Sequence, residues 1–236
     1  MAVRLLVRTL SELCVTVGAL MVLFVVYVLF WTGLRADSAM DGEIHRLQDS
    51  WATQPVATVR PSTPHKVPDS ARPAPEVTPY PQGKAFAVMY VPRLGRAWHK
   101  PVLQGTGTDT LKRGLGHYAD TARLGGVGNF AVAGHRRTYG DPFKDFPRLR
   151  KGDEVVLTDG RTWYTYEIDR APYRTVPTDV AVVDPVPVKS GYTVPGRYLT
   201  LTTCDPEWGH SHRLVTWGHL ESTQPVEDGM PKGMAG

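Results

Sequence analysis

The chain has 236 residues, enough for one domain of ordinary size with additional segments, and it contains two cysteines, Cys14 and Cys204. This cysteine content excludes a small domain held together by several disulfides. The formal net charge of +4 is modest and no long block of like charges occurs, so the sequence does not indicate nucleic-acid binding.

An uncharged apolar run near the N-terminus extends from Leu13 to Trp31. It is long enough for an α-helix to cross a hydrocarbon core of about 30 Å, and longer than the apolar part of a signal peptide. Arg4 and Arg8 precede it, and the positive-inside rule places them in the cytoplasm. We therefore expect a single-pass protein of the cell membrane, with a cytoplasmic N-terminus at 1–12, an anchor at 13–34 and the rest of the chain outside.

The residues that follow the apolar run, 35–84, are predicted to form a juxtamembrane segment and a proline-rich spacer. The first part is polar with scattered apolar residues and suits a short juxtamembrane helix. Eight prolines lie between Pro55 and Pro81, a composition typical of an extended, semi-rigid spacer that holds a domain away from the bilayer. A polyproline ligand for a partner protein is the alternative.

From residue 85 to 222 the sequence consists of short runs rich in β-branched and aromatic residues, separated by Gly, Pro and Asp. This pattern predicts an all-β domain, either a barrel or a sandwich. Short helices or 3-10 turns are expected at 110–118 and 142–149. The remaining residues, 223–236, are polar and are predicted to be a disordered tail.

One strand pattern, Leu199 to Thr203, runs directly into Cys204 and is followed by Asp205 and Pro206, which predict a turn. If the apolar run lies in a bilayer, Cys14 cannot reach Cys204, so Cys204 is an unpaired thiol outside the cell. A lone cysteine is more often an inert buried residue than a nucleophile, so this feature needs partners before it indicates catalysis.

Two such partners are present in the sequence. The strand pattern that ends near Ala133 is followed by His135, and an imidazolium beside a thiol favours the thiolate and can protonate a leaving amine. The last strand pattern begins at Arg213, whose guanidinium is always charged and can stabilise an oxyanion. The alternatives are an ordinary polar histidine at a strand end and a surface ion pair of Arg213 with Asp205 or Glu207.

Together, TLTTC, AGHR and the downstream RLV resemble the sortase family of Gram-positive bacteria, over about residues 85–220. The stretch GHYADTARLGGVGNFAVAGHR is most similar to class E sortases of high-GC Gram-positive bacteria. The resemblance implies a closed β-barrel of about eight strands. It also implies that Cys204 forms a thioester with the substrate threonine, that His135 acts as acid and then base, and that Arg213 steadies the oxyanion.

The resemblance also suggests substrate-binding residues. Class E sortases carry a tyrosine near the substrate pocket, which goes with a preference for LAxTG over LPxTG signals, and Tyr118 occupies the similar position here. The alternative is that Tyr118 packs in a short helix. Thr203 is a candidate pocket residue, or else a residue that only completes the strand.

No cofactor is predicted, and no metal. His210 and His212 lie near Cys204, but together with His135 they lack the spacing of a firm zinc ligand set. Between residues 177 and 195 the acidic residues are Asp179 and Asp184, too few to indicate a calcium site.

The predicted function is transpeptidation, with secreted proteins that carry C-terminal sorting signals as one partner. The other partner is the amine of a lipid-linked peptidoglycan precursor. A pilin-polymerising sortase is the second hypothesis, although neither a lid before the barrel nor a C-terminal apolar segment is evident in the sequence. A catalytically silent, membrane-tethered binding module is the third.

Overall fold

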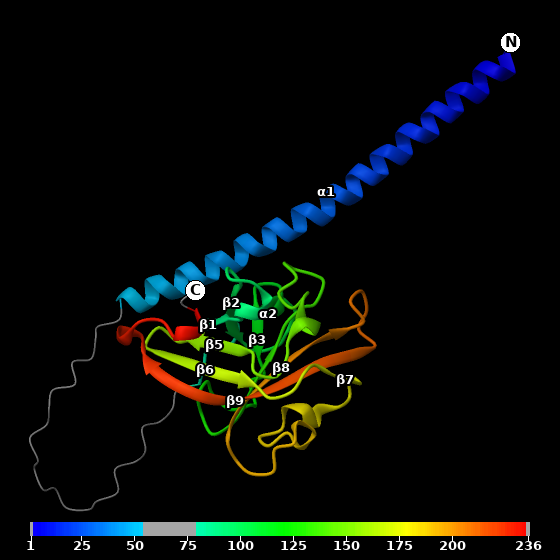
Figure 1. Ribbon diagram of the computed structural model, residues 1–236. Coiled ribbons are helices and arrows are strands. Elements are labelled where there is room, and N and C mark those ends of the chain that lie inside the picture. Colours follow the sequence, from blue (N-terminus) through cyan, green and yellow to red (C-terminus); the bar gives the residue numbers. More distant parts are fainter. Residues whose placement is uncertain (1, 54–78, 235–236) are drawn as a thin grey trace, which may run out of the picture.

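The structure, a computed structural model, describes residues 2–53 and 79–234, with only the backbone described at 2, 3, 5 and 28–34. It contains a long N-terminal helix and a β domain (Figure 1). The strands are β1 (Ala85–Tyr90), β2 (His99–Gln104), β3 (Leu115–His117), β4 (Gly128–Ala133), β5 (Glu154–Thr158), β6 (Thr162–Ile168), β7 (Tyr173–Thr175), β8 (Arg197–Asp205) and β9 (His212–Pro225). The helices are α1 (Ala2–Thr53) and α2 (Thr108–Leu111), and the 3-10 turns are η1 (Pro92–Leu94), η2 (Phe146–Arg148), η3 (Val180–Val183), η4 (Val188–Ser190), η5 (Val226–Asp228) and η6 (Lys232–Met234).

The sheet closes on itself. Its order is β6-β5-β1-β2-β3-β4-β8-β9-β7, and an additional pairing of β6 with β9 joins the two sides. Eight strands thus form the ring, while β7 lies outside it along β9. The predicted all-β fold, a closed barrel of about eight strands with short helices and one N-terminal apolar helix, is confirmed.

The strand β8 shows how the sequence builds the barrel wall. Leu199 and Leu201 are fully buried in the main core, while Thr200 and Thr202 alternate with them and face outward, as the two-residue period of a strand requires. On the outer face a second cluster, formed by Val182, Val215 and Trp217, packs η3 against β8 and β9. The outer face of β8 is therefore covered beside Thr200, whereas Cys204 nearer the end of the strand is only partly buried.

Two segments differ from the sequence predictions. Residues 115–117, expected in a helix or turn, form β3, because they pair with β2 on one side and β4 on the other. The structure also places residues of the predicted disordered tail on the domain. There β9 continues to Pro225 by pairing with Thr162, and Val226 donates a hydrogen bond to the Arg161 carbonyl at 2.9 Å.

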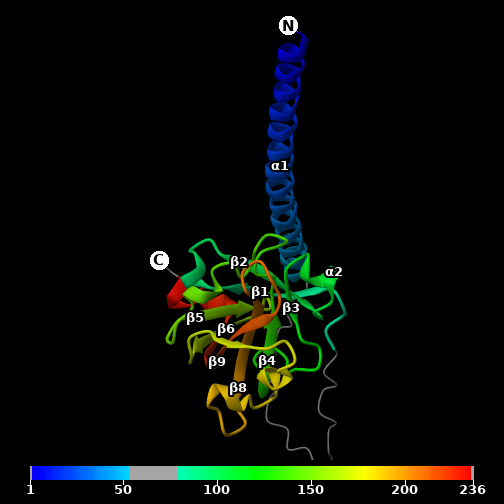
Figure 2. The ribbon, with the colours of Figure 1, turned by 90° about the vertical axis from the view of Figure 1, so that its right-hand side faces the viewer.

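The helix α1 is continuous, and its two halves have different surroundings. Within the described part of the chain, one stretch is long and apolar enough to cross a membrane, Leu6–Tyr27, and its side chains are exposed. Figures 1 and 2 show this half extending away from the barrel, while the C-terminal half runs along it. The juxtamembrane helix expected from the sequence is thus the direct continuation of the apolar one.

The C-terminal half of α1 packs on β1 and β2. Ile44 and Leu47 are buried at this contact and pack with Val88 of β1, whereas Met40, at 1 % exposure, lies against the loop at Gly140. Glu43 is also buried and accepts a hydrogen bond from Arg113 at 2.7 Å. Glu43 also pairs with Arg46 of α1 at 2.9 Å, and the Arg113 contact adds a partner that the helix has only when it is docked on the barrel.

The proline-rich segment lies mostly outside the described residues, which end at Thr53 and resume at residue 79. The reach that the sequence suggested for this spacer does not determine the distance from the apolar run to the barrel. That distance is set by α1, because the helix is already docked on the barrel before the prolines begin.

Candidate active site

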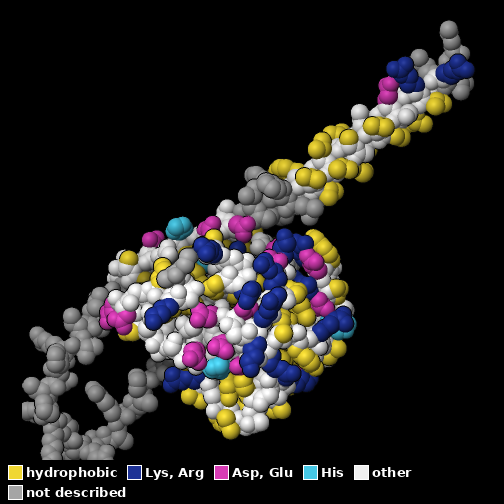
Figure 3. All heavy atoms as spheres, viewed as in Figure 1, with side chains coloured by type: hydrophobic (Ala, Val, Ile, Leu, Met, Phe, Trp, Pro, Cys, Tyr) yellow, Lys and Arg dark blue, Asp and Glu magenta, His cyan; other side chains and the backbone are white. Residues whose placement is uncertain are grey.

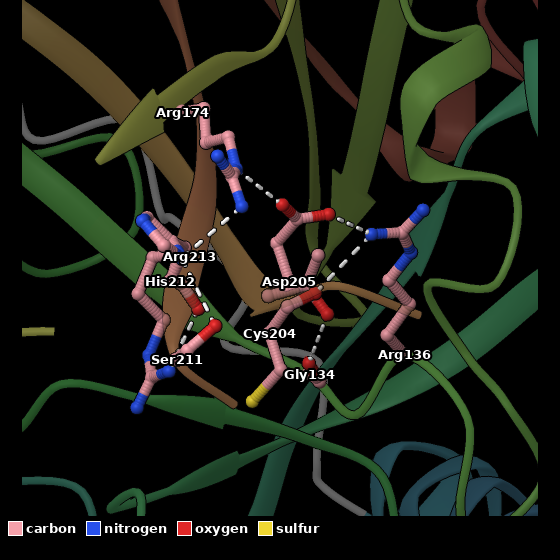
Figure 4. A network of polar contacts seen from close by, with 9 residues as sticks. Gly134, Arg136, Arg174, Cys204, Asp205, Ser211, His212 and Arg213 are labelled. Atoms are coloured by element: carbon pink, nitrogen blue, oxygen red, sulfur yellow. Dashed lines mark hydrogen bonds and ion pairs between the residues drawn. The ribbon is translucent and has the colours of Figure 1, made fainter. Parts of the chain in front are cut away.

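The thiol of Cys204 lies near the end of β8, opposite Arg213 on β9. The two residues are directly paired in the antiparallel register, so their side chains leave the same face of the sheet with Cβ atoms about 5 Å apart. In Figure 4 the Cys204 sulfur and the Arg213 guanidinium extend to the same side of the two strands. Cys204 is a free, partly buried cysteine, and Cys14 is exposed on α1.

The imidazole of His135 comes from the other neighbour of β8. Strand β4 pairs with β8 in parallel, with Ala133 beside Thr202. His135 lies two residues after Ala133, and Cys204 lies two residues after Thr202. Two hydrogen bonds hold this continuation. Gly134 N–H donates to the Thr202 carbonyl at 3.1 Å, and the Thr203 hydroxyl donates to the Gly134 carbonyl at 2.8 Å. The topology therefore brings His135 level with Cys204.

The surroundings of His135 favour its neutral form. Burial lowers the pKa of its imidazole below the ordinary value, and the ring of Tyr139 lies 5.2 Å from it between centroids. Its Nε2 is buried and has no hydrogen-bond partner among the residues that the structure describes. An unpartnered ring nitrogen is available for a proton transfer, whereas one engaged in a structural hydrogen bond is not.

A charged cluster that sequence reasoning missed joins the two catalytic candidates. Arg136, directly after His135, donates to the Asp205 carboxylate at 2.5 Å, and Arg174 on β7 donates to its other oxygen at 2.6 Å (Figure 4). Burial alone would raise the pKa of Asp205, but the two guanidinium groups outweigh it and the pKa is lowered. The sequence did contain a signal for this cluster, because the acidic Asp205 directly follows Cys204 and the basic Arg136 directly follows His135.

A cavity of about 100 Å³ lies on the face of β8 to which Cys204 belongs. Thr202 and Cys204 are two residues apart on one strand, so they share this face. Arg213, opposite Cys204, lines the cavity, whereas Cys204 and His135 do not. Its lining is mostly apolar and is provided by Tyr118, Thr175, Val176, Pro177, Asp179, Val180, Val182, Val183, Thr202, Arg213 and Val215. A short extended peptide with small apolar side chains suits such a groove.

The two predicted substrate-binding residues have different positions. Tyr118 follows β3 and lines the cavity, where its hydroxyl lies 3.0 Å from the Thr202 hydroxyl. Thr203 is buried on the inner face of the wall, with its hydroxyl on the Gly134 carbonyl, and does not line the cavity. Its neighbour Thr202 provides the hydroxyl there, because successive residues of a strand face opposite ways.

Of the residues considered for metal binding, His212 and Asp179 have side-chain partners, and His210 has a backbone contact. The His212 Nδ1 faces Arg174 at 3.1 Å, and the His210 carbonyl accepts from Arg213 at 3.0 Å. Asp179 accepts a hydrogen bond from Lys189 at 2.6 Å, which is the main reason why its pKa is lowered. The Asp179–Lys189 ion pair holds the segment between β7 and β8, and hydrogen bonds hold the start of β9.

Comparison with known proteins gives consistent results. A family model described as "Sortase domain" matches residues 89–221. Sortase SrtE1 of Streptomyces coelicolor is 34 % identical over 96 % of this chain, and the chain spans 60 % of that relative's length. Sortase SrtE2 of the same organism is 33 % identical over 94 % of this chain and 84 % of the relative.

A solved structure, that of sortase E from Streptomyces avermitilis, superimposes with a TM-score of 0.63. It is 73 % identical in sequence, and the match covers 66 % of this chain and 99 % of that one. The chain belongs to the sortase family of cysteine transpeptidases and is similar to its class E members.

Proposed function

We propose that this chain is a membrane-anchored sortase whose nucleophile is Cys204, with His135 as acid and base and Arg213 as the oxyanion-stabilising group. The observation that carries the proposal is the directly opposed pair of Cys204 and Arg213, beside a strand that continues into His135. The ends of three adjacent strands thus provide a nucleophile, a residue for acid–base catalysis and a fixed positive charge. Acyl transfer needs these three groups close together.

In the acylation step the Cys204 thiolate attacks the carbonyl carbon of the substrate threonine. The negative charge that develops on the carbonyl oxygen is stabilised by the Arg213 guanidinium, whose Nη1 is already held by the carbonyls of His210 and His212 at 3.0 and 2.9 Å. The imidazolium of His135 donates its proton to the departing glycine nitrogen. The products are a Cys204 thioester and a free glycine amine.

In the second step an acceptor amine attacks the thioester. His135, now neutral, takes a proton from the attacking nitrogen, and Cys204 leaves as the thiolate. A new amide bond replaces the thioester, so no water or external energy source is consumed. Burial of His135 supports this role, because a lowered pKa makes the neutral base readily available.

The substrate in this proposal is a secreted protein with a C-terminal sorting signal, cleaved between threonine and glycine. The small cavity beside Cys204 supports a compact residue such as alanine at the second position of the signal, with Tyr118 at the wall. We therefore propose a preference for LAxTG over LPxTG.

The acceptor in this proposal is the amine of a lipid-linked peptidoglycan precursor, met at the outer face of the membrane. The apolar, exposed stretch Leu6–Tyr27 supports anchorage, and Arg4 and Arg8 before most of it support a cytoplasmic N-terminus. Figure 3 shows hydrophobic side chains along this part of α1 and basic ones only near its N-terminal end.

The test uses the full chain reconstituted in lipid nanodiscs, with LAxTG and LPxTG peptides and either a glycine or a lysine amine as acceptor. We expect a thioester on Cys204 by mass spectrometry and a ligated product that favours LAxTG and the glycine amine. Cys204→Ala, His135→Ala and Arg213→Ala should each lose at least 100-fold in kcat/KM. Cys14→Ala is the matched control and should keep full activity.

Three results would contradict the proposal. Absence of cleavage with both peptides would favour a binding module. A preference for the lysine amine would favour pilin polymerisation. Retention of activity in His135→Ala would remove His135 from the acid–base role while leaving Cys204 as nucleophile.

A further inference from the structure

The docked half of α1 fixes which edge of the barrel faces the proposed membrane anchor. Helix and barrel are joined by buried apolar contacts and by the Glu43–Arg113 pair, and the helix is continuous with the apolar stretch. A domain attached in this way cannot rotate freely about a linker. The orientation that follows rests on the proposed anchorage of Leu6–Tyr27 in a bilayer.

The edge nearest the exposed part of α1 is formed by two loops. In Figures 1 and 2 the loop between β8 and β9 projects on the side of the domain toward which α1 leaves. The loop after His135 lies directly under the helix, since a Cβ added at Gly140 would be 2.4 Å from Met40 Cε and 3.0 Å from the Asp37 carboxylate. We call residues 137–141 and 206–211 the membrane-side edge.

Side-chain contacts tie the two loops together. The Arg137 guanidinium stacks over the ring of Trp208 at 4.8 Å and also pairs with Asp141 and Glu207. Trp208 nevertheless remains 73 % exposed, and Tyr139 in the other loop 41 %. A guanidinium that covers one face of the indole restricts its orientation, while most of the remaining surface stays exposed.

These aromatic side chains have the chemistry of a membrane–water interface. Tryptophan and tyrosine concentrate at the headgroup level of bilayers. We infer that the membrane-side edge rests in the phospholipid headgroup layer of the bilayer that α1 crosses, with Trp208 as its aromatic anchor. Because Cys204 lies two residues before this edge, the thiol is then close to the membrane surface.

This orientation deepens the proposed function. A lipid-linked amine and a protein substrate still attached to the membrane would both be confined to the layer next to the bilayer. If the β8–β9 loop lies in that layer, the domain encounters the amine and the protein substrate by diffusion along the membrane alone. The same loop leads from Cys204 to Arg213, so contact with lipid and substrate access involve one structural element.

The inference is tested with fluorescent labels on the full chain in nanodiscs, in the Cys14→Ser and Cys204→Ala background. Trp208→Cys carries the label in one protein, and Val188→Cys, which is 76 % exposed on η4, carries it in the control. Lipids with a quencher near the headgroup should reduce the fluorescence at 208 at least twofold and leave the label at 188 nearly unchanged. Equal quenching at both sites, or none at 208, would overturn the inference.

A second measurement leaves the indole in place. With brominated lipids, the fluorescence lost from the parent chain should exceed that lost from Trp208→Phe, and equal losses would contradict lipid contact. Shielding of Trp208 that depends on protein concentration instead of lipid would indicate a second copy and overturn the inference. Neither measurement requires turnover, so failure of the peptide assay would reject the proposed function and leave this result standing. A chain that does not co-purify with nanodiscs would reject the orientation and the anchorage together.

Discussion

Arg136 donates a hydrogen bond of 2.5 Å to the carboxylate of Asp205, which links the residue after His135 to the residue after Cys204. Both side chains are largely buried, and Arg136 also lies 3.5 Å from the Cys204 carbonyl. Arg174 binds the opposite oxygen of Asp205. The spacing of the proposed nucleophile Cys204 and the proposed acid–base residue His135 therefore depends on a charge cluster that need not touch the substrate.

The first prediction concerns this cluster. Asp205→Asn removes the charge that Arg136 and Arg174 share, so the ends of β4 and β8 can separate, and we expect kcat to fall on the order of 10–100-fold with KM changed less than threefold. Asp145→Asn is the control, since its carboxylate lies 3.7 Å from Arg148 at the surface. Steady-state kinetics with a sorting peptide measure kcat and KM for both variants. A change confined to KM would mean that Asp205 contacts substrate instead of positioning the dyad.

The second prediction concerns specificity. Tyr118→Phe removes the hydroxyl that lies 3.0 Å from Thr202, and we expect the ratio of kcat/KM for LAxTG over LPxTG to fall about 3–10-fold, the worth of one hydrogen bond. Thr203→Val is the comparison. Its hydroxyl holds the Gly134 carbonyl on the other face of β8, so both peptides should lose activity by the same factor. An unchanged ratio in Tyr118→Phe would exclude the tyrosine from substrate choice.

The strands and the candidate nucleophile could be predicted from the sequence because each depends on a local pattern. Leu199 to Thr203 alternate as a strand does, and Asp205 with Pro206 mark the turn. The opposition of Cys204 and Arg213 also follows, since two strands joined by a short loop pair as a hairpin. Barrel closure by β6 and β9 could not be derived in this way, because the pairing of distant segments has no local signature.

Other features depend on contacts between distant residues. Thr203 was chosen for its place beside Cys204, but the direction of a strand side chain depends on register, which puts Thr202 in the cavity instead. The docking of α1 was not predicted, because Ile44, Leu47 and Trp51 form only a scattered apolar pattern in a polar segment. The pattern can be understood as a docking surface only once its partners on the barrel, Val88, Arg113 and Gly140, are known.

The third prediction concerns the imidazole of His135. Burial lowers its pKa, and the ring of Tyr139 contributes to the cover, so Tyr139→Ala should raise the pKa toward the ordinary value near 6.5. A larger imidazolium fraction near neutral pH follows, and the acid limb of the kcat/KM profile moves to higher pH. Tyr139→Phe keeps the ring and should leave the profile in place. Identical profiles for the alanine and parent proteins would show that other groups bury His135.

The fourth prediction concerns stability against pH. His117 is 1 % exposed, and burial lowers its pKa to about 4, whereas an unfolded histidine titrates near 6.5. The neutral form is favoured in the fold, so this contribution is complete above pH 6.5. It is lost as the pH falls toward 4, by roughly 3 kcal/mol.

Urea unfolding between pH 7 and 4 should therefore show a shallower acid loss in His117→Gln than in the parent chain. The stability contribution of His219 depends on pH in the opposite direction. Burial lowers its pKa, but Asp169 outweighs burial and raises it, so its contribution is present below pH 6.5 and lost as the pH rises. Equal slopes in the parent and His117→Gln would show that folding does not lower the pKa of His117.

The last prediction tests the docking of α1 with two glycines of similar backbone conformation. Gly160, in the turn between β5 and β6, has φ +86°, and a Cβ there would lie 2.3 Å from Cδ2 of Trp51. Gly152 has φ +84°, and a Cβ there meets open space. Alanine costs about 1 kcal/mol in backbone strain at either position, so the difference between the variants reports the packing of Trp51.

We expect Gly160→Ala to lose roughly 1–3 kcal/mol more than Gly152→Ala, because the rigid indole must leave its site. Thermal unfolding of the full chain in nanodiscs measures the loss, and hydrogen exchange should rise in the C-terminal half of α1 only for Gly160→Ala. Equal losses, with α1 equally protected in both, would mean that the helix is not held to the barrel at Trp51.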